Sequence, residues 1–163
     1  ENAEKYKKEQ DALEQEIQEL LQNEGSDEAY GDGQLKWPVP TRSYISSYFG
    51  WRTLYGRPNY HKGIDIPGSA GTNIVAADAG KVLKVSKLTY GYGWHVIIDH
   101  GNGVSTLYAH CSRLDVSVGD YVEKGQVVAG IGTTGNSTGN HVHFEVRING
   151  VQQNPLNYVK QPS

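Results

Sequence analysis

Two short segments carry side chains of the types that bind zinc. His61 and Asp65 are four positions apart, and His141 and His143 are two apart. In an extended chain the members of each pair point to the same side, and His141 and His143 would lie about 6.6 Å apart along the strand. Imidazole nitrogen and carboxylate oxygen are zinc ligands, and a catalytic zinc site leaves one coordination position free of protein. The two segments therefore indicate a candidate catalytic metal site.

Each segment is ambiguous by itself. A strand with two histidines two positions apart is often only a polar sheet face, and a single His-x-x-x-Asp spacing is weaker evidence still. The segment 132–140 favours the metal interpretation, because it contains only Gly, Thr, Asn and Ser and leads directly into His141. Such a loop leaves room for a ligand or water at the start of the strand.

The elements that would position these residues are short strands. Alternating apolar residues bounded by Gly-rich turns predict strands at 74–77, 80–87, 95–100, 104–109, 121–122, 127–131 and 141–148. Asn102-Gly103 between two apolar runs predicts a tight hairpin. The two prolines in Trp37-Pro38-Val39-Pro40 exclude helix and predict an extended entry strand at a sheet edge. No amphipathic helical window follows the first 33 residues, so we expect an all-β sandwich or barrel.

The first residues differ from the rest in charge and periodicity. Residues 1–33 hold three Lys and eleven acidic residues, a net charge of −8, whereas the remaining residues carry +5. A heptad runs from Ala3 to Leu20, and predicts the end of a longer coiled coil; a solvated helical tail is the alternative. We therefore predict a helical coiled-coil end at 1–24, a linker at 25–36 and a β-domain at 37–160. On this division, deletion of residues 1–33 should leave the β-domain folded, zinc-loaded and active.

Composition excludes several classes of protein. No apolar run approaches the roughly 20 residues that span a bilayer, and one cysteine cannot form an intrachain disulfide. The β-domain lacks the dense Lys and Arg clusters of a nucleic-acid-binding surface, so we expect no nucleic-acid partner. The chain contains no methionine and opens on Glu1, which predicts a piece of a longer or processed protein.

Four motifs together resemble the peptidase M23 family, the LytM- and lysostaphin-type zinc endopeptidases of bacterial cell walls. They are Phe49-Gly50-Trp51-Arg52, His61-Lys62-Gly63-Ile64-Asp65-Ile66, Leu107-Tyr108-Ala109-His110 and the segment 135–147, which contains His141-Val142-His143-Phe144-Glu145-Val146-Arg147. The resemblance covers about residues 37–158. It implies an antiparallel β-sandwich or half-open barrel of the lysostaphin-like (duplicated hybrid motif) type, here preceded by an N-terminal helix.

The resemblance also implies roles for five residues. His61, Asp65 and His143 match the ligands of a Zn²⁺ cofactor, and His110 and His141 match the two catalytic histidines that flank the activated water and the scissile carbonyl. An imidazole near neutrality can act as a base or as an oxyanion donor, and the sequence leaves the division of these roles open. Trp94-His95 departs from the usual family pattern, and we interpret His95 and His100 as structural. Cys111 follows His110 and should therefore point away from the site as a buried apolar residue.

Three functions follow from these motifs. The first is a zinc endopeptidase that hydrolyses peptide bonds in peptidoglycan; the second is a non-catalytic coiled-coil activator of separate murein hydrolases, although all five site residues are present. The third is a carrier domain, because Val118 to Val128 resembles a lipoyl or biotinyl hairpin; shared topology explains that likeness better. The expected partner is a peptidoglycan peptide, and residues 3–20 would mediate either coiled-coil self-association or binding to a partner helix. The expected location is extracytoplasmic, in an exported or membrane-tethered parent protein.

The sequence also leaves a groove hypothesis open. Tyr55, Tyr60, Tyr90, Tyr92 and Trp94 lie in two predicted loop segments, 52–60 and 88–95. They would either line a substrate groove or cap the edges of the sheets.

Overall fold

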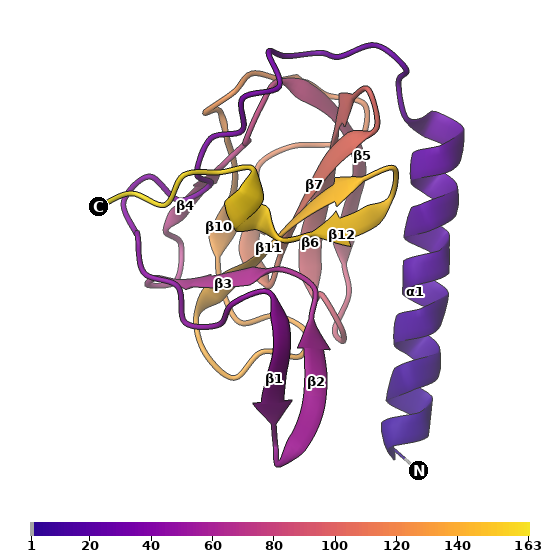
Figure 1. The fold of residues 1–163 in the computed structure, drawn as a ribbon, viewed down its shortest axis with the longest axis vertical. Helices are drawn as coiled ribbons and strands as arrows, with labels where there is room; N and C mark the ends of the chain where they lie inside the picture. The colour runs from indigo at the N-terminus through magenta and orange to yellow at the C-terminus, as the bar shows by residue number, and fades with distance from the viewer. Residues whose placement is uncertain (1) are drawn as a thin grey trace.

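The computed structural model describes residues 2–163, which form an N-terminal helix followed by a β-domain (Figure 1). The elements are α1 (Asn2–Glu24), β1 (Gly50–Leu54), β2 (Arg57–His61), β3 (Ile64–Pro67), β4 (Asn73–Val75), β5 (Gly80–Lys87), β6 (Trp94–Gly101), β7 (Val104–Ala109), β8 (Cys111–Leu114), β9 (Tyr121–Val122), β10 (Val127–Ile131), β11 (His141–Ile148), β12 (Val151–Gln153) and a short 3₁₀ helix (Pro155–Asn157).

The strands form two antiparallel sheets and a separate hairpin. The larger sheet has the order β12-β11-β7-β6-β5-β9, and β3 pairs with the first half of β11. The smaller sheet has the order β4-β10-β8. The hairpin β1–β2 projects from one end of the domain (Figure 1). The all-β antiparallel prediction with a preceding helix is therefore confirmed.

The predicted strands agree with the structure within one or two residues at each end, and five of them agree at both ends. The extended entry strand predicted at 37–40 is wrong, because no strand forms there. The segment still reaches the edge of β4, where the Pro38 carbonyl accepts a hydrogen bond from Val75 N–H at 2.8 Å. Pro38 and Pro40 have no N–H to return, so a ladder cannot continue.

The larger sheet has an apolar face that is buried against the rest of the β-domain. Strand alternation places Val96, Ile98, Tyr108, Val142 and Phe144 on this face, and all five are fully buried. They share one apolar cluster with residues of the smaller sheet, including Ile74, Val128 and Ile131. Burial of this cluster is the main source of stability that the sequence pattern encodes.

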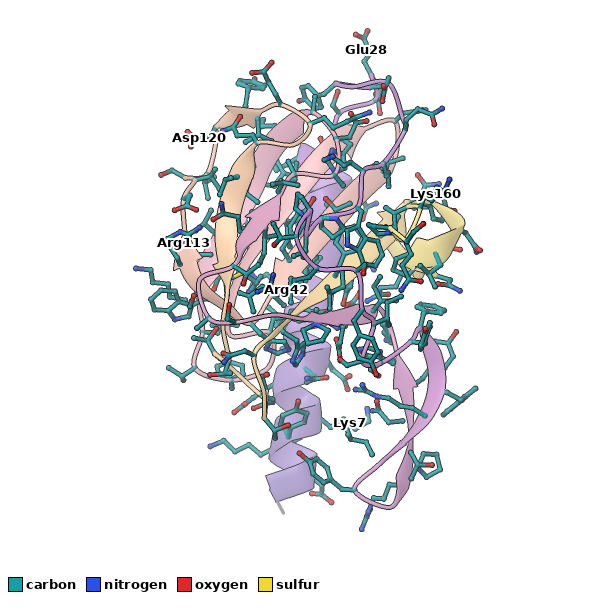
Figure 2. The ribbon with its side chains drawn as sticks, turned by 90° about the vertical axis from the view of Figure 1, so that its left-hand side faces the viewer. Lys7, Glu28, Arg42, Arg113, Asp120 and Lys160 are labelled. Carbon is teal, nitrogen blue, oxygen red and sulfur yellow. The ribbon has the colours of Figure 1, made fainter. Side chains whose placement is uncertain are left out.

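Helix α1 covers the opposite face of the larger sheet. Leu13 and Ile17 are buried there against Ile97, Leu107 and Ala109. Figure 2 shows the helix behind the strands, with its first turns, where Lys7 lies, extending beyond the sheet at the end where the hairpin β1–β2 projects. The helix is not apolar enough to cross a membrane.

These contacts use part of the predicted heptad. Leu13 and Ile17 pack on the sheet of the same chain, Tyr6 and Gln10 are exposed, and the side chain of Ala3 lies outside the described part of the structure. The coiled-coil interpretation and the three-part division of the chain stay predictions. The residues between Gly25 and Lys36 contact the β-domain as well; for example, Tyr30 N–H donates to the His100 carbonyl.

His95 predicts a pH dependence of folding stability. Its ring is fully buried on the helix-facing side of the sheet, Nδ1–H donates to the Gly93 carbonyl at 2.9 Å, and Nε2 has no partner. Burial lowers the pKa of His95 to about 4, below its value of about 6.5 in an unfolded chain. Between these two pKa values only the unfolded state takes up the proton. The contribution of His95 to folding stability therefore falls as the pH drops from about 6.5 to 4.

The measurement is urea unfolding of the chelator-treated protein between pH 4 and 7. If the unfolded state binds one proton more than the folded state, the free energy of unfolding changes by about 1.4 kcal/mol per pH unit. We expect His95→Phe to lose up to this much of the slope relative to the unmodified chain. Identical slopes in the two proteins would contradict the assignment.

Candidate metal centre

Strand pairing explains why Asp65 and His143 meet although they are 78 positions apart in the sequence. Asp65 on β3 lies directly opposite His143 on β11 in the antiparallel register. His61 ends β2, and the turn at Lys62-Gly63 brings it beside β3. Gly63 is required by this packing, because a Cβ at this position would lie 2.9 Å from Cε1 of the His143 ring.

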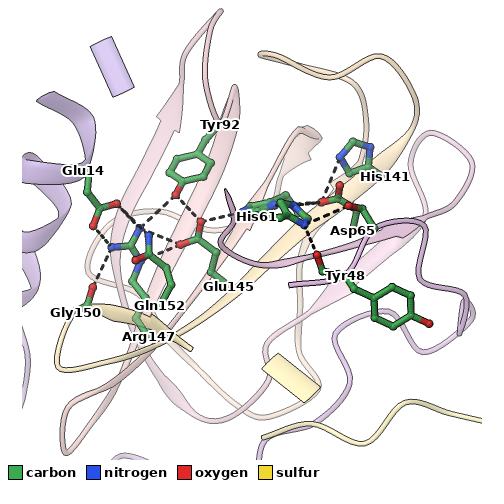
Figure 3. A network of polar contacts seen from close by, with 12 residues as sticks. Glu14, Tyr48, His61, Asp65, Tyr92, His141, Glu145, Arg147, Gly150 and Gln152 are labelled. Carbon is green, nitrogen blue, oxygen red and sulfur yellow. Dashed lines mark hydrogen bonds and ion pairs between the residues drawn. The ribbon is translucent and has the colours of Figure 1, made fainter. Parts of the chain in front are cut away.

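The three predicted metal ligands are buried and adjacent. Figure 3 labels two of them, His61 and Asp65. Asp65 Oδ1 lies 3.2 Å from His61 Nε2 and 3.1 Å from His143 Nδ1, and the two ring nitrogens are 3.1 Å apart. One ligand atom from each residue falls within 4.8 Å of the others. The set of two imidazoles and one carboxylate fits a zinc site with a free coordination position.

The hydrogen-bond partners of the rings orient them so that one nitrogen of each ring faces Asp65. His61 Nδ1–H donates to the Tyr48 carbonyl at 3.0 Å, which leaves Nε2 facing Asp65. His143 Nε2–H donates to Glu145 Oε2 at 2.8 Å, which leaves Nδ1 facing Asp65. Metal-binding histidines in proteins are held in this way, with the second ring N–H donated to a carboxylate or carbonyl.

The two predicted catalytic histidines lie beside this group. His141 Nε2 is 3.7 Å from Asp65 Oδ1, and the His110 ring centroid lies 5.1 Å from that of His141 and 6.1 Å from that of His143. His110 Nδ1–H donates to the Thr134 carbonyl and His141 Nδ1–H to the Gly139 carbonyl, so the loop 132–140 orients both rings. Nε2 of each ring is thereby free to exchange a proton.

His110 occupies an unusual backbone position. It lies between β7 and β8 with a φ of +63°, in the left-handed region that residues other than glycine rarely adopt. Its N–H donates to the Tyr92 carbonyl at 2.8 Å, which holds the turn in place. Non-glycine residues in strained conformations of this kind cluster at active sites.

Burial and neighbouring charges shift the pKa values of the site. Burial alone would raise the pKa of Asp65, but hydrogen bonds from His143 and His61 outweigh it and hold the pKa well below its usual range. Burial alone would lower the pKa of His143, whereas Asp65 and Glu145 raise it to about 9. Burial, with the nearby His143, lowers the pKa of His110 to about 4, and burial also lowers that of His141. The two rings beside the ligand group are therefore neutral at pH 7.

Sequence analysis assigned no role to Glu145 and Arg147, yet both belong to the surroundings of the ligands. Both side chains are fully buried, and Glu145 Oε1 accepts a hydrogen bond from Arg147 Nε at 2.9 Å. Burial alone would raise the pKa of Glu145, but Arg147 and His143 hold it at about 2. Strand parity could have found them, because alternate residues of β11 share one side and 141, 143, 145 and 147 are all polar.

Cys111, His100 and the tyrosines of the two predicted loop segments lie outside the ligand group. Cys111 is fully buried in the apolar cluster, and burial raises the pKa of its thiol to about 12. His100 donates and accepts structural hydrogen bonds with the Ala79 carbonyl and Thr106. Tyr92 is half-buried and donates its hydroxyl to Glu145, so it supports the ligands. Tyr55 and Tyr60 are exposed on the hairpin β1–β2, and the groove hypothesis for them stays a prediction.

The fold and the arrangement of these side chains define a β-domain built around a candidate three-ligand metal centre. Residues 59–155 match the model of peptidase family M23. The chain therefore belongs to peptidase family M23.

Curated relatives include enzymes and an activator. The chain is 39% identical over 138 residues to an uncharacterized metalloprotease of Haemophilus influenzae, 44% over 114 residues to the DD-carboxypeptidase/endopeptidase Mpg of Neisseria meningitidis, and 36% over 125 residues to the murein hydrolase activator NlpD of Escherichia coli. These matches cover 83%, 69% and 77% of the chain, but only 29%, 26% and 31% of the respective relatives. The activities of the whole relatives therefore do not transfer directly.

Solved structures share the fold. A Pseudomonas aeruginosa protein assigned to peptidase family M23 matches with a TM-score of 0.77 and 28% identity over 97% of this chain and 63% of its own. A zinc-containing peptidase of Vibrio cholerae matches with a TM-score of 0.69 and 31% identity over 78% of this chain and 39% of its own. The catalytic domain of lysostaphin from Staphylococcus simulans matches with a TM-score of 0.65 and 29% identity. This match covers 71% of this chain and 91% of that domain. The lysostaphin-like fold is confirmed.

Proposed function

We propose that this chain is the catalytic domain of a zinc-dependent endopeptidase that hydrolyses peptide bonds in bacterial peptidoglycan. One observation carries the proposal: His110 and His141 present free Nε2 atoms beside the buried group of His61, Asp65 and His143. The DD-carboxypeptidase/endopeptidase Mpg and the murein hydrolase activator NlpD, both relatives of this chain, support the substrate class. Because peptidoglycan lies outside the cytoplasmic membrane, the proposed location is extracytoplasmic, in an exported or membrane-tethered parent protein.

The chemistry divides between the metal and the two histidines. Zinc, when bound, supplies a Lewis acid that polarises a peptide carbonyl and lowers the pKa of water. A neutral imidazole beside it accepts a proton from the attacking water and returns it to the leaving amine. The second imidazole donates a hydrogen bond to the oxyanion that develops on the carbonyl when its Nε2 is protonated, because its Nδ1–H is already donated to a loop carbonyl. His110 and His141 supply these two functions.

A specific observation favours a second candidate, a non-catalytic activator of separate murein hydrolases. The chain is 36% identical to NlpD over 77% of its length. The presence of all five site residues favours the enzyme, because an activator has no need of a complete ligand set and two free imidazoles.

One set of measurements separates these functions. The purified chain is analysed for zinc by elemental analysis and incubated with isolated peptidoglycan, and soluble fragments with new amino termini are counted. We expect one zinc per chain and fragment release that a chelator stops and added zinc restores. An activator would hold no zinc and release nothing alone, yet accelerate an added murein amidase. A covalent lipoyl or biotinyl mass would instead identify a carrier.

A further inference from the structure

Helix α1 lies on the same face of the large sheet as the candidate metal centre. The register pairs His143 with Ala109 and Glu145 with Leu107, and Leu107 in turn pairs with Ile97. Ile97, Leu107 and Ala109 are the residues on which Leu13 and Ile17 of the helix are buried. The helix and the metal ligands are therefore supported by the same surface.

A continuous series of polar contacts joins the helix to a ligand (Figure 3). Arg147 donates from both terminal nitrogens to the Glu14 carboxylate, at 2.8 and 2.9 Å. Arg147 Nε donates to Glu145 Oε1 at 2.9 Å, and Glu145 Oε2 accepts from His143 Nε2 at 2.8 Å. Each contact involves at least one charged group and most are short, which places them among the stronger hydrogen bonds of proteins.

Burial makes the members of this series dependent on one another. The side chains of Arg147 and Glu145 are each 1% exposed, whereas that of Glu14 is 29% exposed. A buried charge is strongly unfavourable unless it is paired, so Arg147 needs both carboxylates to stay in place between them. Glu14 is itself held by Gln18 at 2.8 Å and Gln152 at 3.2 Å, which fixes its carboxylate for bidentate pairing.

We propose that helix α1 is a positioning element for the metal centre. Glu14 fixes Arg147, Arg147 fixes Glu145, and Glu145 orients the ring of His143 with Nδ1 toward the metal. Docking of the helix therefore raises metal affinity. This inference rests on the proposed function as a zinc protein, and it predicts the opposite of the expectation that residues 1–33 can be removed without effect on zinc.

The test uses Glu14→Gln and Glu14→Ala in the full chain, with Glu16→Gln as the matched control. Glu16 is on the same helix and pairs with Lys84 of β5 at 2.8 Å, but it makes no contact in the series that ends at His143. Zinc affinity is measured by competition with a chelator, and ligand geometry by the visible absorption of the cobalt-substituted protein. Because loss of an outer partner of a metal ligand typically costs 10- to 100-fold in affinity, we expect about a tenfold loss for both Glu14 variants.

The outcomes separate this inference from the proposed function. Weaker zinc binding with an altered cobalt spectrum in the Glu14 variants, and neither change in Glu16→Gln, supports positioning. Unchanged affinity in the Glu14 variants, or an equal loss in Glu16→Gln, overturns it while leaving the zinc enzyme intact. If the unmodified chain binds no zinc, the proposed function fails. The positioning of His143 by the helix is then tested in the metal-free chain by the ring ¹⁵N resonances of His143. These resonances must shift in Glu14→Gln but not in Glu16→Gln.

Discussion

Replacement of Asp65 with alanine is expected to remove zinc from the protein at equimolar metal. Asp65 Oδ1 is the atom that His61 and His143 share, at 3.2 and 3.1 Å, and a three-ligand site has no spare ligand. The variant also leaves two buried imidazoles close together without the carboxylate between them. Removal of His61 or His143 should have the same consequence, because each supplies one of the three ligands.

Zinc content after chelator challenge measures this effect. Glu123→Ala is a suitable control, since Glu123 is an exposed carboxylate in the turn between β9 and β10. Thermal unfolding of the metal-free variants shows whether the β-domain is still folded. Full zinc retention in the folded Asp65→Ala protein would refute the ligand assignment.

Substitution of His110 or His141 should separate metal binding from turnover. Both rings lie beside the ligand group with Nε2 free, so we expect zinc to remain while turnover on peptidoglycan falls by on the order of 10²-fold or more. His141→Ala is a direct truncation. For His110, alanine is accompanied by His110→Asn, because asparagine tolerates the positive φ of this position better than alanine does.

Zinc content and fragment release are measured on the same samples. Thr138→Ala, an exposed position in the same loop as the carbonyls that orient both rings, is the control. Loss of zinc in either histidine variant would show that the replaced residue is a metal ligand. Retention of both zinc and full turnover would remove it from the catalytic group.

Strand periodicity carried most of the fold prediction, because an alternating pattern bounded by glycine turns identifies a half-buried strand. The bounds of β5, β7, β9, β10 and β11 follow from it. It missed β1, β2 and β12, which are short, largely exposed strands with polar residues on both faces. It also missed the four-residue strands β3 and β8. It also failed at Pro38 and Pro40, where an extended chain meets a sheet edge without the N–H groups that a ladder needs.

The sequence predicted the part of the site that residue types and short motifs identify. His61, Asp65, His110, His141 and His143 come together in the structure as the motifs indicated. Glu14 could not be found in this way, because a glutamate among eleven acidic residues in the first 33 carries no local signal. Its importance depends on which turn of α1 faces Arg147, and that is decided by the packing of Leu13 and Ile17.

The position of β11 in the chain has a consequence for biosynthesis. His61 and Asp65 emerge early, but His141 and His143 emerge only when about nine tenths of these residues have been made, and β11 must then insert between β3 and β7. A nascent or C-terminally truncated chain that ends before this strand has two of the three candidate ligands and lacks Arg147, which pairs with Glu14. On the proposed function, metal can therefore load only after β11 has been made and has paired with β3 and β7.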